Sequence, residues 1–307
     1  MTLQSPYLEQ SFSFPAPAKL NLFLHIVGQR PDGYHDLETL FQFIDYCDTL
    51  SLKVMSSPAI TLTSQIEGVA QEDNLIYKAA KLLQESSGTA YGVEIDIEKQ
   101  LPMGGGLGGG SSNAATVLVA LNELWQCNFT TEQLAQLGLT LGADVPIFVH
   151  GFAAFAQGVG EKLTPAAPIE YYYVITKPHC SISTQVVFTN ENLTRDTPKL
   201  DFDNNQINAF SGNLFEAPYK NDCQDVVINH YSEVAKLLAW LIEYAPSRMT
   251  GTGACIFSCC TSFDEAKALQ KKLPESVTSV IAKGLNKSPL CFAVEKLRKN
   301  KPNFKTN

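Results

Sequence analysis

The chain has 307 residues, of which 45% are hydrophobic and only 18% are charged, and this composition excludes a disordered protein. The length predicts two domains or one large domain. The 31 acidic and 23 basic residues give a net charge of −8, which argues against binding to nucleic acid through neutralisation of its phosphates.

The first ten residues lack the basic and apolar regions of a signal peptide. No stretch approaches the roughly 18 consecutive apolar residues that a membrane span needs. The eight cysteines are scattered without C-x-x-C or zinc spacing, which is typical of a reducing compartment. We therefore expect a cytoplasmic protein with no membrane partner.

The first predicted element is a strand over residues 18–27. Apolar side chains occupy one side of it, and the other side carries Lys19, Asn21, Phe23 and His25, so the pattern predicts one buried face. Further strands are expected over 37–45, 48–55 and 93–98, and the alternation in the last indicates an antiparallel sheet. Helices are expected over 73–85, 114–125 and 131–141. Thr130 and Gln133 form a capping-box pattern at the start of the last helix.

A boundary between domains is predicted near Gly158–Gly160, which divides the chain into residues 1–160 and 161–307. In the second part we expect a strand over 171–176 and helices over 224–230, 233–244 and 263–272. A polar loop is expected over 194–208. The basic segment 295–307 is predicted to be a solvated, disordered tail.

The most informative segment lies at 104–110, where six of seven residues are glycine. Without Cβ atoms, backbone N–H groups can approach a ligand closely, and the helix that follows presents unpaired N–H donors. Together these features predict a cradle for a polyphosphate. The dinucleotide-binding pattern G-x-G-x-x-G also matches, but a run so rich in glycine matches it at almost any starting position. That motif follows a buried parallel strand, whereas the strand predicted here is antiparallel. Ser111 stands where a Walker A loop needs lysine.

Residues 102–112 resemble the second motif of the GHMP kinases. Residues 15–24 with 30–35 resemble the first motif, 141–148 resemble the segment with the catalytic aspartate, and 250–254 resemble the third motif. The resemblance covers about residues 14–290 in the family's order. It implies an α+β, two-domain fold, with an N-terminal domain like domain 2 of ribosomal protein S5 and a ferredoxin-like C-terminal domain. It also implies transfer of a phosphoryl group from ATP to an alcohol.

The resemblance assigns catalytic roles to two residues. Asp144 would accept the proton of the substrate hydroxyl, and Lys19 would keep Asp144 ionised and orient the attacking oxygen. From the residues alone, Asp144 fits the N-cap of a short helix equally well, and a lysine such as Lys19 usually faces solvent. Mg²⁺ should bridge the phosphates, with Ser111 or Ser112 as a possible ligand and no clear carboxylate.

The remaining predicted site residues are expected to bind ATP or the acceptor substrate. The ATP residues implied by the resemblance are Pro102, Met103, Gly104, Gly105, Gly106, Leu107, Gly108, Gly109, Gly110, Ser111 and Ser112, with Asn74 near adenine or, equally, as an N-cap. The third motif, Gly251, Thr252 and Gly253, would line the other side of the cleft. Asn21 would lie beside the acceptor.

The resemblance also implies the substrate, a cytidine diphosphate-linked methylerythritol. By resemblance, Tyr34 and Phe188 stack on cytosine, His35 bonds its edge, and Thr184 lies nearby, although segment 181–188 lacks prolines that some relatives have. Three alternatives remain: a GHMP kinase for a small alcohol or phosphomevalonate, a non-catalytic nucleotide-binding module, and a Rossmann oxidoreductase.

Overall fold

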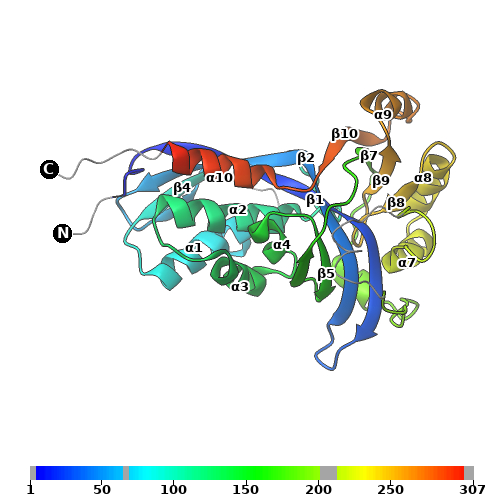
Figure 1. Cartoon of the computed structure of the whole chain (residues 1–307), viewed down its shortest axis with the longest axis horizontal. Helices are drawn as coiled ribbons and strands as arrows, with labels where there is room; N and C mark the ends of the chain where they lie inside the picture. Colours follow the sequence, from blue (N-terminus) through cyan, green and yellow to red (C-terminus); the bar gives the residue numbers. More distant parts are fainter. Residues whose placement is uncertain (1–4, 65–68, 201–212, 301–307) are drawn as a thin grey trace.

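The computed structural model describes residues 5–64, 69–200 and 213–300. Its helices and strands form two lobes, joined by strands that run from one lobe into the other (Figure 1). The described strands make one continuous ten-stranded sheet, whose main path is β3-β4-β2-β10-β7-β9-β8. The predicted α+β class is confirmed, because the strand pairs are almost all antiparallel and the helices are segregated from them.

The N-terminal lobe is built on two long antiparallel strands, β1 (Ser11–Gln29) and β2 (His35–Met55). The strands predicted over 37–45 and 48–55 are one strand, because a register shift at Pro17/Ala18 absorbs the intervening residues as a bulge. Four more strands extend this sheet: β3 (Ile60–Leu62), β4 (Gly92–Glu98), β5 (Ala154–Gly158) and β6 (Lys162–Pro165).

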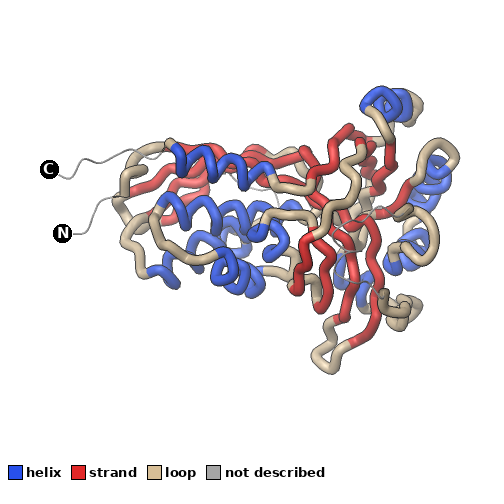
Figure 2. The backbone as a smooth tube through the Cα atoms, in the orientation of Figure 1, coloured by secondary structure: helices blue, strands red, loops and turns tan. Residues whose placement is uncertain are grey.

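The helices of this lobe gather on one side of its strands (Figure 2). They are α1 (Leu75–Ser87), preceded by the 3₁₀ turn Gln71–Asp73, then α2 (Gly109–Leu124), α3 (Thr131–Leu141) and α4 (Val145–His150). The capping box predicted at α3 is confirmed, since Thr130 Oγ1 accepts from Gln133 N–H and Gln133 Oε1 accepts from Thr130 N–H. None of the helices in the described ranges is long and apolar enough to cross a membrane.

The C-terminal lobe has the β-α-β-β-α-β order of a ferredoxin-like fold. Its antiparallel strands are β7 (Tyr172–Lys177), β8 (Ser247–Met249), β9 (Ile256–Cys260) and β10 (Thr278–Leu285), in the spatial order β10-β7-β9-β8. Helices α7 (Asp222–His230) and α8 (Ser232–Ile242) connect β7 to β8, and α9 (Phe263–Gln270) connects β9 to β10. A short helix, α5 (Thr184–Phe188), follows β7.

The prediction of a disordered tail from residue 295 is wrong for its described part. Residues Pro289–Lys299 form helix α10, which returns to the N-terminal lobe and packs on its core (Figure 1). Leu290, Val294 and Leu297 are buried on one stripe, while the basic residues lie on the other faces of the same helix. Residues 301–307 lie outside the described part of the chain, as do 201–208 of the predicted polar loop.

The prediction of one exposed face on the first strand is also wrong. Lys19, Asn21, Phe23 and His25 are all buried, because the C-terminal lobe packs against that face. Two hydrogen bonds mark this contact: Leu24 N–H donates to Lys220 O, and the Arg248 guanidinium donates to Leu22 O. A polar strand face enclosed between two lobes is an uncommon arrangement that points to a site.

Candidate active site

Lys19 lies at the centre of a polar cluster at the lobe interface. Its Nζ lies 3.4 Å from Asp144 Oδ2, donates to Asn21 Oδ1 at 2.5 Å, and donates to Gly106 O at 3.2 Å. The Lys19 side chain is 3% exposed, whereas that of Asp144 is 37% exposed. A buried ammonium is therefore compensated by three oxygens, and the carboxylate it faces remains open to a ligand.

Asp144 occupies the N-cap position of α4, but its side chain makes no capping hydrogen bond. Pro146 in the first turn has no N–H group, which reduces the demand for a cap. The carboxylate is thus directed to Lys19 instead of to the helix backbone. Asp144 therefore has the N-cap position that its residue type predicts, while its oxygens remain available to a ligand.

The glycine loop between β4 and α2 packs too closely for side chains. A Cβ on Gly106 would lie 2.2 Å from Thr250 O, and one on Gly108 would lie 3.1 Å from Lys19 Cε. Both residues have positive φ angles, +73° and +74°, which glycine adopts without strain. Gly108 is also the N-cap of α2 and has no side chain to cap it. The first N–H groups of α2 therefore lack helical partners and can bind an anion.

The third motif, residues 250–254, contacts the glycine loop from the C-terminal lobe. At its end, Ala254 N–H donates to Gly104 O, and the following residue, Cys255, donates its N–H to Gly105 O, both at 3.2 Å. Thr250 Oγ1, at the start of the motif, accepts from Asn21 N–H at 2.9 Å. First, second and third motifs thus meet, although Asn21 and Thr250 are 229 residues apart.

Four of the predicted acceptor residues lie in three places. His35, at the start of β2, and Phe188, at the end of α5, stack with ring centroids 5.2 Å apart and an interplanar angle of 28°. Thr184 Oγ1 and Thr252 Oγ1 are 3.0 Å apart. Tyr34 instead projects from the β1–β2 hairpin with 61% exposure. Burial and the positive charge of Arg195 lower the pKa of His35, so its ring is neutral at physiological pH.

Asn74 has a clear structural role. Its side chain caps α1 by accepting from Ile76 N–H at 3.0 Å. The start of α1 lies beside the glycine loop, since Leu75 Cδ1 is 3.4 Å from the position a Cβ on Gly110 would take. Ser112, in the first turn of α2, has a buried hydroxyl without a hydrogen-bond partner. Met103 is 53% exposed.

Sequence reasoning missed two supports of this site. Lys99 follows β4 and donates to the buried carboxylate of Asp48 at 2.6 Å, and Asp48 also accepts from the backbone N–H groups of Gln100 and Leu101. Lys99 Nζ lies 3.5 Å from where a Cβ on Gly109 would be. A lysine five residues before the glycine run was the available signal.

The second support is Asn221, whose Nδ2 donates to Met249 O at 2.7 Å and to Gly251 O at 2.8 Å. It therefore fixes the backbone on both sides of Thr250. No pattern in the sequence marks Asn221, because it lies 28 residues from the nearer of these partners.

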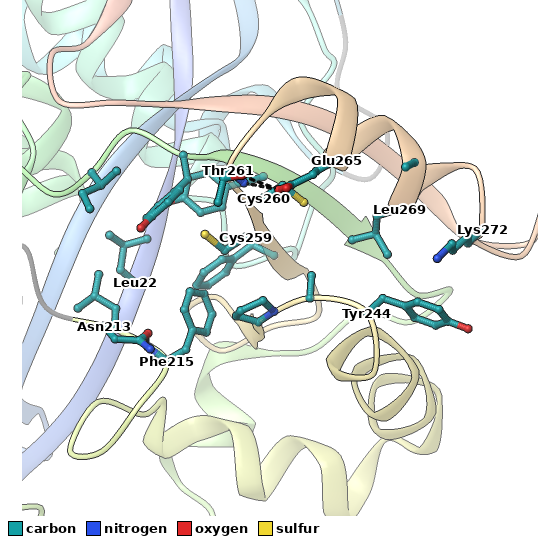
Figure 3. Close-up of a pocket in the computed structure, with 18 residues that line it drawn as sticks. Leu22, Asn213, Phe215, Tyr244, Cys259, Cys260, Thr261, Glu265, Leu269 and Lys272 are labelled. Atoms are coloured by element: carbon teal, nitrogen blue, oxygen red, sulfur yellow. Dashed lines mark hydrogen bonds between the residues drawn. The ribbon is translucent and has the colours of Figure 1, made fainter.

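A cavity of about 730 Å³ lies elsewhere in the C-terminal lobe, against β7, β9 and α9 (Figure 3). None of the predicted site residues lines it. Its acidic group, Glu265, already accepts from Thr261 N–H and Oγ1–H at 2.8 Å, and Lys272 Nζ sits over the Tyr244 ring. These groups are satisfied within the fold, so the cavity is not part of the candidate site.

Family profiles match both lobes. The profile described as "GHMP kinases N terminal domain" matches residues 74–152, and that described as "GHMP kinases C terminal" matches residues 201–278. The chain therefore belongs to the GHMP kinase family.

Individual relatives are more specific. The chain is 61% identical over 291 residues to the 4-diphosphocytidyl-2-C-methyl-D-erythritol kinase of Colwellia psychrerythraea, which covers 95% of this chain and 96% of that protein. It is 57% identical to the Aliivibrio fischeri protein of the same name, over 93% of this chain and 96% of the relative.

Solved structures agree with this relationship. A crystal structure of 4-(cytidine 5'-diphospho)-2C-methyl-D-erythritol kinase matches with a TM-score of 0.75 and 31% identity, covering 89% of this chain and 99% of that one. A homoserine kinase from Cytophaga hutchinsonii matches with a TM-score of 0.64 at 16% identity, over 94% of this chain and 98% of that one. The second match supports the two-domain fold alone.

Proposed function

We propose that the protein transfers the γ-phosphoryl group of ATP to the 2-hydroxyl of 4-diphosphocytidyl-2-C-methyl-D-erythritol, giving the 2-phosphate and ADP, in the non-mevalonate route to isoprenoids. The observation that carries the substrate is the 61% identity to the Colwellia kinase over 95% of this chain. The Lys19–Asp144 pair beside the glycine loop supports the chemistry.

In this proposal Asp144 accepts the proton of the substrate hydroxyl. The hydroxyl oxygen forms a bond to the γ-phosphorus while the bond from that phosphorus to the bridging oxygen breaks, and ADP leaves with the electron pair. Lys19 stabilises the negative charge that develops on the attacking oxygen. Its bonds to Asn21 and Gly106 hold the ammonium in place before the substrate arrives, so little reorganisation is needed during the reaction.

ATP is expected to lie with its phosphates along Gly104–Ser112. The free N–H groups of the first turn of α2 and the positive end of that helix favour the anion. Lys99 adds a cation at the same end of the loop. Asn74 is placed near adenine, where its side-chain amide N–H groups can contact the base while its Oδ1 caps α1.

Mg²⁺ belongs to this proposal as the ion that neutralises the β- and γ-phosphates. It takes oxygen ligands, keeps several waters, and needs few protein groups when phosphates are present. Ser112 fits this role, because its hydroxyl is buried in the first turn of α2 without a partner. In the described segments no group of three or more His, Cys, Asp or Glu side chains is placed to hold a metal. The phosphates and water would therefore supply most of the ligands of the ion.

The cytosine end of the substrate is expected beside His35 and Phe188. An aromatic face and a polar edge are what a pyrimidine base needs, and Tyr34 on the hairpin can close over the base from its exposed position. Thr252 belongs to the third motif, and the hydroxyl of Thr184 lies beside its hydroxyl. We place the reaction in the cytoplasm, where the eight free thiols stay reduced.

ADP release measured in a coupled assay tests the proposal. Turnover is expected with 4-diphosphocytidyl-2-C-methyl-D-erythritol and not with mevalonate, phosphomevalonate, homoserine or galactose, and ³¹P NMR should show a new phosphomonoester on the 2-position. Absence of turnover above background, or a preference for one of the small alcohols, would refute the substrate assignment. Stabilisation by ATP and not by NAD in a thermal-shift assay would exclude the oxidoreductase alternative.

A further inference from the structure

Arg195 joins the two elements that are expected to hold the base. Its guanidinium donates to His35 Nε2 at 3.1 Å, to Phe188 O at 3.1 Å, to Asn190 O at 2.7 Å and to Leu193 O at 3.0 Å. All four acceptors are uncharged. The side chain therefore spans from the first strand pair, which carries His35, to the chain around α5, which carries Phe188.

The contact with Arg195 fixes the protonation of His35. A guanidinium has only donors and keeps its proton in proteins, so His35 Nε2 must offer a lone pair. The ring proton then resides on Nδ1. A histidinium would place an N–H group against the guanidinium, and burial together with the Arg195 charge lowers the pKa of His35 in agreement with this. Arg195 is the charged group that faces His35 in the described part of the chain.

We propose that Arg195 is a positioning residue that holds His35 as the neutral Nδ1–H tautomer, so that Nδ1–H donates to an acceptor on the cytosine edge. The inference rests on the proposed placement of cytosine beside His35. Cytosine carries an acceptor at N3, where uracil carries a hydrogen, so a fixed donor at this point favours cytosine. Arg195 acts through His35 and the backbone of Phe188, and it need not touch the substrate.

The tautomer can be read directly in the wild-type protein. A ¹⁵N-resolved NMR spectrum of the imidazole rings, assigned with His35→Asn, should show His35 with a protonated Nδ1 and an unprotonated Nε2 at pH 7.5. A protonated Nε2, or a histidinium, would overturn the proposal. This measurement needs no substrate and no variant at Arg195, so it stands even where Arg195→Met folds poorly.

Binding then tests the consequence. Arg195→Met should weaken binding of 4-diphosphocytidyl-2-C-methyl-D-erythritol about tenfold, as expected for loss of one oriented hydrogen bond, and should leave the Kd for ATP unchanged. Arg298→Met removes an arginine from α10, where it pairs with Glu123, and serves as the matched control. Arg195→Lys keeps a charge and a donor, and should recover most of the affinity.

The pH dependence separates a fixed tautomer from general support of the fold. Both phosphates of the substrate are esterified, so they do not titrate near neutral pH. In Arg195→Met the defect should shrink as pH falls from 8.5 to 6, because histidinium again carries a proton on Nδ1, while wild-type binding stays flat. An equal, pH-independent loss of ATP and substrate binding would overturn the proposal. If His35→Asn and Arg195→Met both bind the substrate normally, the cytosine placement fails and the proposal fails with it, even where ADP release is intact.

Discussion

Replacing Lys19 with methionine removes the charge at the centre of the site while keeping most of the side-chain volume. Lys19 Nζ is 3.4 Å from Asp144 Oδ2. At that separation the attraction is about 5 kcal/mol with an effective dielectric constant near 20 and about 1 kcal/mol in bulk water. Lys19 is buried and Asp144 is partly exposed, so screening sets a value between these limits, roughly 3 kcal/mol. If the transition state loses that stabilisation, kcat falls by ~10²-fold to ~10³-fold.

The assay is ADP release under saturating ATP and substrate, with Kd for ATP measured separately by calorimetry. Lys53→Met is the matched control, because Lys53 is another lysine on a β-strand, and its Nζ lies 3.1 Å from Glu9 Oε2 on the surface. The Lys19 variant leaves no unpaired buried charge, because Asp144 keeps its contact with solvent. Its melting temperature should fall only modestly, from loss of the donor to the buried Asn21 Oδ1. A kcat within about threefold of wild type, with the control also unchanged, would refute the electrostatic role of Lys19.

Three further outcomes follow from the geometry. Gly106→Ala should raise KM for ATP at least tenfold and lower the melting temperature more than Gly88→Ala does. Both glycines have left-handed φ angles, but only a Cβ on Gly106 would meet an atom, Thr250 O at 2.2 Å. Equal effects of the two variants on melting and KM would show that the clash is absent. Tyr34→Ala should raise KM for the cytidine substrate about tenfold and spare ATP binding, and equal loss of both ligands would remove Tyr34 from the base site. Burial raises the pKa of Cys255 to about 12, so its thiol stays protonated at pH 8 and should resist iodoacetamide in the folded protein, as mass spectrometry can verify; rapid labelling without unfolding would contradict the packing described for it.

Local signals in the sequence predicted most elements of the fold. The capping residues at 130 and 133 marked the start of α3, and alternation identified β4 as an antiparallel-type strand. It pairs antiparallel with β2, although its other neighbour, β3, is parallel to it. Long-range packing explains the errors. The polar residues of β1 predict an exposed face, but the second lobe covers that face. In α10, the basic residues suggested a solvated tail, although Leu290, Val294 and Leu297 form a buried apolar stripe.

The site was predictable where chemistry is encoded in a short motif. The glycine loop indicated a phosphate cradle from its composition alone, but the pairing of Lys19 with Asp144 required the family resemblance, because 125 residues separate them in the sequence. Asn221 and Arg195 act through contacts with distant backbone and with His35, and neither lies in a motif. The contact of Asn221 forms when the C-terminal lobe folds, and that of Arg195 with His35 forms only when the two lobes meet.

The central claim is that Asp144 removes the proton from the acceptor hydroxyl. Asp144→Asn keeps the size and N-cap position of the residue but abolishes its basicity. In a single-turnover experiment with enzyme in excess and both ligands bound, phosphoryl transfer should fall at least ~10²-fold, with Kd values for ATP and the cytidine substrate within about threefold of wild type. Phosphoryl transfer at the wild-type rate in that experiment would show that Asp144 is not the base.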